Sequence, residues 1–113
     1  MRRSFLGLIA SAALGWALVA HAGPSDEIRR LVERGLADQA YTLGALHPEL
    51  QGNPEFDYYF GVAAIESGRA GAGVISLEHY LARVPRNGDA RMRLALGYLE
   101  LCQTVPSEPM IVS

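Results

Sequence analysis

Apolar positions recur at helical spacing along most of this chain, and short segments with glycine, proline or asparagine interrupt them. The clearest amphipathic stripe places apolar residues at i, i+3, i+7 and i+10, on one side of a helix. This stripe consists of Val74, Leu77, Leu81 and Val84. Because no alternating strand pattern of useful length competes before the last few residues, we expect an all-α chain.

The breaks divide the chain into five expected helices. They run from Ser25 as N-cap to Gly35, from about Leu36 to Leu46, from Asn53 as N-cap to Gly68, from the glycines at 71 and 73 to Pro85, and from about Ala90 to Gln103. Asn53-Pro54 is the clearest start, since asparagine caps helices well and proline suits the first helical position. Two glycines in the fourth helix each cost roughly 1 kcal/mol relative to alanine, so we expect this helix to start late or fray.

A shift of about 34 residues superposes residues of similar size at helical spacing, for example Phe60 on Leu94 and Gly61 on Ala95. Here the sequence resembles the tetratricopeptide repeat (TPR), a helix–turn–helix unit with the pattern W-x2-L-G-x2-Y, A-x3-F and P. The matching segments are Asp57-x2-Phe60-Gly61-x2-Ala64, Gly73-x3-Leu77 and Pro85, then Arg91-x2-Leu94-Ala95-x2-Tyr98. The resemblance covers residues 25–103 and departs at the Trp position, where Asp57 or Arg91 stands.

The resemblance implies a short α-solenoid of antiparallel helix hairpins, with five helices in about two and a half TPR-like units over residues 23–103. Small residues such as Gly61 would let paired helices approach, while Leu77 and Tyr80 would fill the space between hairpins. In this family the first helix of each hairpin lines a concave groove for peptides or helices. Carried over, that groove comprises Glu55, Tyr58, Tyr59, Val62, Ile65 and Glu66, then Asp89, Met92, Arg93, Leu96, Leu99 and Glu100.

The fifth expected helix has two apolar stripes. We expect Leu94, Tyr98 and Leu101 to face back onto the preceding helix. The second stripe consists of Met92, Leu96 and Leu99, whereas a terminal helix of a repeat array should be polar on its outer side. Three explanations are open: the stripe binds a partner segment, another chain covers it as in a homo-oligomer, or the chain is a truncated or frameshifted product of a longer repeat protein. We slightly favour the third, and we expect residues 104–113 to form an irregular tail.

The N-terminus has the organisation of a secretory signal peptide over residues 1–22. Arg2 and Arg3 precede an apolar run that ends at Ala20, and Ala20-His21-Ala22 forms an A-x-A cleavage site. The run is shorter than the roughly 20 residues of a membrane-spanning helix. We therefore expect export to the bacterial periplasm, by general secretion or by a twin-arginine route, with no membrane span in the mature chain.

The sequence contains few features typical of catalytic or ligand-binding motifs. Gly68-x4-Gly73 has the glycine spacing of a phosphate-binding loop, but Val74 and Ile75 follow where Lys and Ser or Thr are required. The formal net charge of −2 argues against a nucleic-acid partner, which would require basic residues clustered on one face. We expect no cofactor and no metal, since no recognisable metal-ligand spacing occurs. Cys102 is expected to be a small buried residue.

The function expected from the sequence is therefore a non-catalytic periplasmic scaffold that binds another protein or a peptide segment. The first alternative is the truncated periplasmic repeat portion of a larger outer-membrane export or assembly protein. A remote alternative is a small hydrolase that uses Ser76 and His79, which lie one helical turn apart.

Overall fold

The computed structural model describes residues 23–104, and every regular element within them is a helix. In chain order these are α2 (Pro24–Glu33), α3 (Ala37–Ala45), the 3-10 turn η1 (Pro48–Leu50), α4 (Pro54–Glu66), α5 (Ala70–Arg83) and α6 (Gly88–Thr104). The prediction of an all-α fold is confirmed. The signal peptide expected over 1–22 lies outside the described residues, as does the expected tail apart from Thr104, which ends α6.

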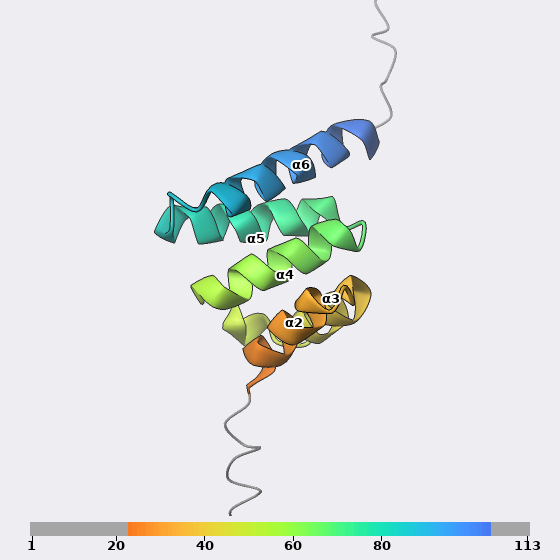
Figure 1. Ribbon diagram of the computed structural model, residues 1–113, viewed down its shortest axis with the longest axis vertical. Coiled ribbons are helices and arrows are strands. Elements are labelled where there is room, and N and C mark those ends of the chain that lie inside the picture. Colours follow the sequence, from red (N-terminus) through yellow and green to blue (C-terminus); the bar gives the residue numbers. More distant parts are fainter. Residues whose placement is uncertain (1–22, 105–113) are drawn as a thin grey trace, which may run out of the picture.

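The helices stack as antiparallel hairpins, α2 with α3 and α4 with α5, followed by α6 (Figure 1). Helix α4 lies in the middle of the stack and contacts α2, α3, α5 and α6. Because α2 and α6 both contact α4, the first helices of successive hairpins lie next to one another. The described residues thus form the short α-solenoid of five α-helices that the sequence predicts.

Both hairpin turns use a glycine with a positive φ angle, 78° at Gly35 and 83° at Gly68. After Gly68, the Arg69 N–H donates to the Ala64 carbonyl at 2.7 Å, and the Gly68 N–H donates to the Ile65 carbonyl at 3.1 Å. This is the Schellman motif, which satisfies the last carbonyls of a helix and needs a left-handed residue. The glycine-rich stretch after α4 therefore begins with a helix terminator, as predicted.

Asparagine caps explain where two helices begin. Asn53 Oδ1 accepts from the Phe56 N–H at 3.3 Å, which confirms the predicted start of α4. Asn87 Oδ1 accepts from the Ala90 N–H at 3.1 Å, so α6 begins at Gly88, two residues before the predicted start. The prediction of Ser25 as the first N-cap is wrong, because α2 begins at Pro24, whose fixed φ suits the first helical position.

Helices α4 and α5 cross closely through a pair of glycines. A Cβ atom on Gly73 would lie 2.8 Å from the Gly61 carbonyl oxygen and 2.4 Å from Ile65 Cγ1. Helix α5 nevertheless begins at Ala70, so the expectation of a late start is wrong. Packing of Ala70 and Gly73 against α4 outweighs the propensity cost of the glycines, as tertiary contacts commonly do.

The core lies between the two hairpins and contains a stack of three aromatic rings. The Phe60 ring lies between those of Tyr41 on α3 and Phe56 on α4, with 5.1 Å between centroids in both pairs. Leu77 on α5 is fully buried, but it packs against Gly61 on α4, within one hairpin rather than in the predicted place between hairpins. One charged residue joins the core, because the Asp57 carboxylate accepts from the Gly52 N–H and is 1% exposed.

Burial raises the pKa of Asp57, and the hydrogen bond from the Gly52 N–H opposes the rise. The folded chain therefore holds the Asp57 proton more tightly than the unfolded chain, and this contribution to stability is lost as pH rises above 3.8. Asp57→Asn removes that dependence while keeping a hydrogen-bond acceptor. We expect the unfolding free energy of the variant, relative to wild type, to increase from pH 3 to pH 7 in urea titrations. A constant difference would contradict this account.

Candidate protein-interaction surface

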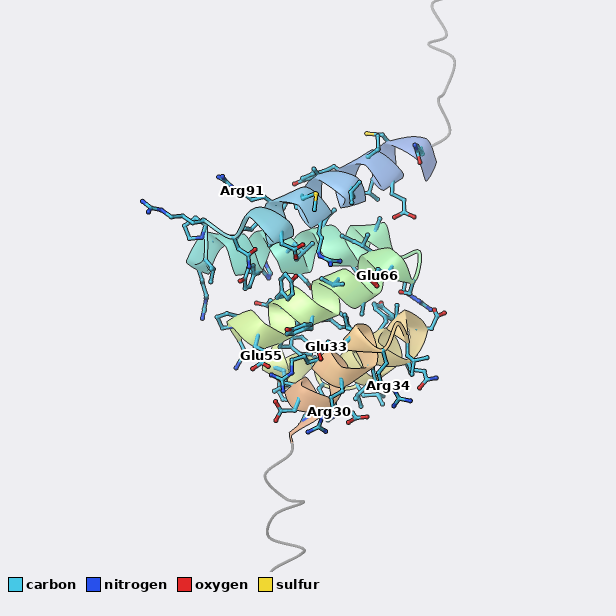
Figure 2. All side chains as sticks on the ribbon, viewed as in Figure 1. Arg30, Glu33, Arg34, Glu55, Glu66 and Arg91 are labelled. Carbon is cyan, nitrogen blue, oxygen red and sulfur yellow. The ribbon has the colours of Figure 1, made fainter. Side chains whose placement is uncertain are left out.

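Side chains that cross between α2, α4 and α6 join the exposed sides of these helices. Arg29 on α2 contacts Glu55 on α4 at 3.3 Å, and Arg93 on α6 contacts Glu66 on α4 at 3.4 Å. Figure 2 shows Glu55 and Glu66 at opposite ends of α4. We call this surface the even-helix face, and it comprises Asp26, Arg29, Glu33, Glu55, Tyr58, Tyr59, Glu66, Asp89 and Arg93.

Carboxylates outnumber guanidinium groups on the even-helix face. Arg29 contacts three carboxylates, at 3.3 to 3.7 Å, and they belong to Asp26, Glu33 and Glu55. Arg93 contacts Asp89 at 2.9 Å and Glu66 at 3.4 Å. Five carboxylates therefore share two guanidinium groups, which leaves this network with a formal charge of −3.

Three tyrosines line a hollow on the even-helix face. The Tyr58 ring packs edge-on against Tyr59, with 4.9 Å between centroids, and is tilted against Tyr80 of α5 at 5.2 Å. The hollow has a volume of about 650 Å³, and we call it the tyrosine hollow. Its lining consists of Arg29, Pro54, Glu55, Tyr58, Tyr59, Tyr80, Val84 and Asn87.

Hydrogen bonds hold two of these rings in place. The Tyr58 hydroxyl donates to Asp89, which also accepts from Arg93 Nε at 2.9 Å. The Tyr80 hydroxyl accepts from Asn87 Nδ2 at 2.8 Å. Burial, followed by the hydrogen bond to Asp89, raises the pKa of Tyr58 to about 12, and the hydrogen bond from Tyr58 lowers the pKa of Asp89. The tyrosine hollow is thus ordered before any ligand arrives, which lowers the entropic cost of binding.

The alkaline titration of the tyrosines should identify Tyr58. The chain has five tyrosines, and the Tyr58 phenol with its pKa of about 12 should ionise late. Since its pKa is raised on folding, its stabilising contribution is complete below pH 10 and is lost as pH rises through 12. We expect absorbance at 295 nm to show a late step that Tyr58→Phe abolishes, with circular dichroism confirming helical structure over the same range. Removal of an earlier step by Tyr58→Phe would contradict the assignment.

The structure brings most of the groove residues predicted on α4 together. Glu55, Tyr58 and Tyr59 line the tyrosine hollow, and Glu66 is exposed beside Arg93. The prediction is wrong for Val62, which is 2% exposed and cannot contact a partner. Its burial follows from the position of α4, which is packed against four other helices and has little free surface.

Helix α6 supplies two separate surfaces. Asp89 and Arg93 face α4, whereas Met92, Leu96 and Leu99 are 59%, 52% and 55% exposed and do not line the tyrosine hollow. We call these three apolar residues the outer face of α6. The predicted second stripe is therefore exposed, and it lies apart from the tyrosines with which the sequence grouped it.

The stripe of α6 predicted to pack against the preceding helix is confirmed in part, since Leu94 and Leu101 are half-buried. Tyr98 is 46% exposed, and its hydroxyl donates to Glu78 on α5. Gly97 is buried instead, where a Cβ atom would lie 2.9 Å from both Ile65 Cδ1 and Val74 Cγ2. Glycine at this position therefore lets α6 approach α4 and α5 closely, since a larger residue would have to displace the Ile65 and Val74 side chains.

The residues with potential chemical reactivity, Ser76, His79 and Cys102, are not part of the even-helix face. Ser76 is 8% exposed while His79 is exposed, and no hydrogen bond joins them among those of the described residues. Cys102 is exposed, so the prediction of a buried cysteine is wrong; it lies near the end of α6, the last helix of the stack. Within residues 23–104, no three potential metal ligands gather, and no helix has the length and apolar character to cross a membrane.

Sequence reasoning missed five of the eight residues that line the tyrosine hollow, namely Arg29, Pro54, Tyr80, Val84 and Asn87. Arg29 and Asn87 were not assigned to any surface, and Tyr80 was placed between the hairpins rather than beside Tyr58. The cap at Asn87 could have been found, because Asn87 precedes Ala90 with the same spacing by which Asn53 precedes Phe56. The place of Arg29 could not, because its contact with Glu55 spans two hairpins.

Comparisons with protein-family models, with curated proteins and with solved structures give no match to this chain.

Proposed function

We propose that this chain is a non-catalytic, tetratricopeptide-like module that binds a segment of another protein on its even-helix face. The observation that carries the proposal is the tyrosine hollow, in which Tyr58 on α4 packs against Tyr59 and against Tyr80 of α5. The sequence of residues 1–22 supports a periplasmic location for this module, reached through a cleaved signal peptide.

The composition of the tyrosine hollow suits protein recognition. Tyrosine gives a large contact area with few rotatable bonds and is enriched among the residues that dominate binding energy. The charged pairs around the hollow, such as Arg29 with Glu55, are partly exposed and resemble the polar rim of an interface. Ser76 and His79 do not support the hydrolase alternative, because Ser76 is buried whereas His79 is exposed.

The outer face of α6 favours a second candidate function. Three large apolar side chains more than half exposed on one helix need a covering partner in a repeat array. That partner is a second copy of this chain, or a further repeat if the chain acts as the periplasmic portion of a larger outer-membrane export or assembly protein. Light scattering of the full chain tests the first case. Leu96→Glu should convert a dimer into a monomer, and a monomeric wild type would contradict it.

Selection from a random peptide library tests the proposed function. Displayed 12-residue peptides are selected on the full chain, and their affinity is then measured for Tyr59→Leu and for the control Tyr98→Leu. Tyr98 is a matched control because it is a half-exposed tyrosine outside the even-helix face. We expect Tyr59→Leu to weaken binding about tenfold, equivalent to about 1.4 kcal/mol, and Tyr98→Leu to leave it unchanged. Equal effects of the two variants would contradict the proposal.

A further inference from the structure

We propose that the even-helix face selects a basic polypeptide segment and that an arginine side chain of this segment occupies the tyrosine hollow. This inference rests on the proposed function and names the chemistry of the partner. It is carried by the excess of carboxylates on the face and by the aromatic lining of the hollow.

Charge is distributed unevenly around the stack. In Figure 2 Glu55 and Glu66 lie on α4 in the middle of the stack, whereas the labelled arginines lie towards its two ends, Arg30 and Arg34 at α2 and Arg91 on α6. The two guanidinium groups within the network are already occupied by its five carboxylates. The face therefore attracts a cationic segment and repels an acidic peptide or a phosphate backbone.

The tyrosine hollow suits a guanidinium group in particular. A guanidinium is planar, stacks on aromatic faces and is less strongly hydrated than an ammonium group. The chain already makes this contact elsewhere, since Arg69 Cζ lies 4.3 Å from the centroid of the Tyr41 ring. Glu55 also lines the hollow, and its carboxylate would pair with the guanidinium group of the bound arginine.

Arg29, which lines the tyrosine hollow, does not prevent an arginine side chain from binding there. Arg29 lies beside Glu55 in the hollow, and its guanidinium also contacts Asp26 and Glu33. Its charge is therefore more than balanced by its neighbours, and this group of four residues has a formal charge of −2. An incoming arginine meets net negative charge there, next to the ring of Tyr58, which a hydrogen bond to Asp89 holds.

A set of four fluorescent 12-residue peptides tests the inference by anisotropy with the full chain. The first peptide repeats Gly-Arg-Ser, and the other three replace every arginine by lysine, by citrulline or by glutamate. Citrulline keeps the shape of arginine without its charge. We expect the arginine peptide to bind most tightly, the lysine peptide about two- to fivefold more weakly, and the other two without saturation.

Variants of the chain locate the binding site. The double variant Glu55→Gln, Glu66→Gln removes two carboxylates of the face, and it should weaken binding of the arginine peptide about fivefold or more. Glu27→Gln is the matched control, because Glu27 pairs with Arg30 at 3.3 Å outside the face. It should change the affinity less than about twofold. Tyr59→Leu should reduce the preference for arginine over lysine.

Negative results in these experiments distinguish a failure of the arginine inference from a failure of the proposed function. Equal binding of the arginine and citrulline peptides, or equal weakening by Glu27→Gln and the double variant, would overturn the inference. If none of the four peptides binds but the random library yields peptides sensitive to Tyr59→Leu, the inference is wrong and the proposed function stands. If the library also yields no such peptide, both are wrong.

Discussion

Replacing Gly73 by alanine is expected to destabilise the fold by about 2 kcal/mol, although alanine is the better helix former. The added Cβ atom would lie 2.8 Å from the Gly61 carbonyl oxygen, which is backbone and cannot rotate away. It would also lie 2.4 Å from Ile65 Cγ1. Helices α4 and α5 must then separate, and the packing of the central hairpin is lost.

Gly71 is the matched control for this prediction, since it lies two residues away in the same helix. A Cβ atom there would meet only Leu101 Cδ2, at 4.0 Å. Gly71→Ala should therefore stabilise the fold, by up to about 1 kcal/mol, through helix propensity alone. Urea unfolding followed by circular dichroism measures both variants. Changes of the same sign in the two would contradict the close crossing of α4 and α5.

Phe60→Ala is expected to cost about 3–5 kcal/mol, the largest loss from any single variant considered. Phe60 is 7% exposed and stacks on both Tyr41 and Phe56, so its removal leaves a cavity between α3 and α4. Gly44 on α3 lies directly against this ring, since a Cβ atom there would lie 2.2 Å from Phe60 Cδ1. The ring therefore joins the first hairpin to the rest of the stack.

Ile75→Ala serves as the control for Phe60→Ala. Ile75 is also a large apolar residue on a helix, but it is 57% exposed, so its truncation should change the unfolding free energy by less than about 0.5 kcal/mol. Urea unfolding gives both values. A small effect at Phe60, or comparable effects at the two positions, would contradict the three-ring core.

The helices and their breaks could be read from the sequence because local chemistry sets them. Gly35 and Gly68 end helices through a left-handed backbone, and Asn53 with Pro54 starts one. Where local signals competed, the prediction failed. Ser25 is a good capping residue, but Pro24 precedes it and starts the helix.

The candidate surface was only partly predictable, because burial depends on how many helices surround a residue. Val62 and Tyr59 both fit the groove positions of the repeat, yet Val62 is buried and Tyr59 lines the hollow. No local pattern separates them. Gly97 likewise gave no signal that it would be buried against α4 and α5, whereas Tyr98 beside it is 46% exposed.

The central claim is that the even-helix face receives a polypeptide, and an amide ¹⁵N–¹H titration with the arginine peptide tests it most directly. Saturating peptide should shift the amide signals around Arg29, Glu55, Tyr58 and Arg93, with little change at Leu43 on α3. Such shifts would place the ligand across α2, α4 and α6. Shifts confined to Met92, Leu96 and Leu99, on the outer face of α6, would contradict the claim.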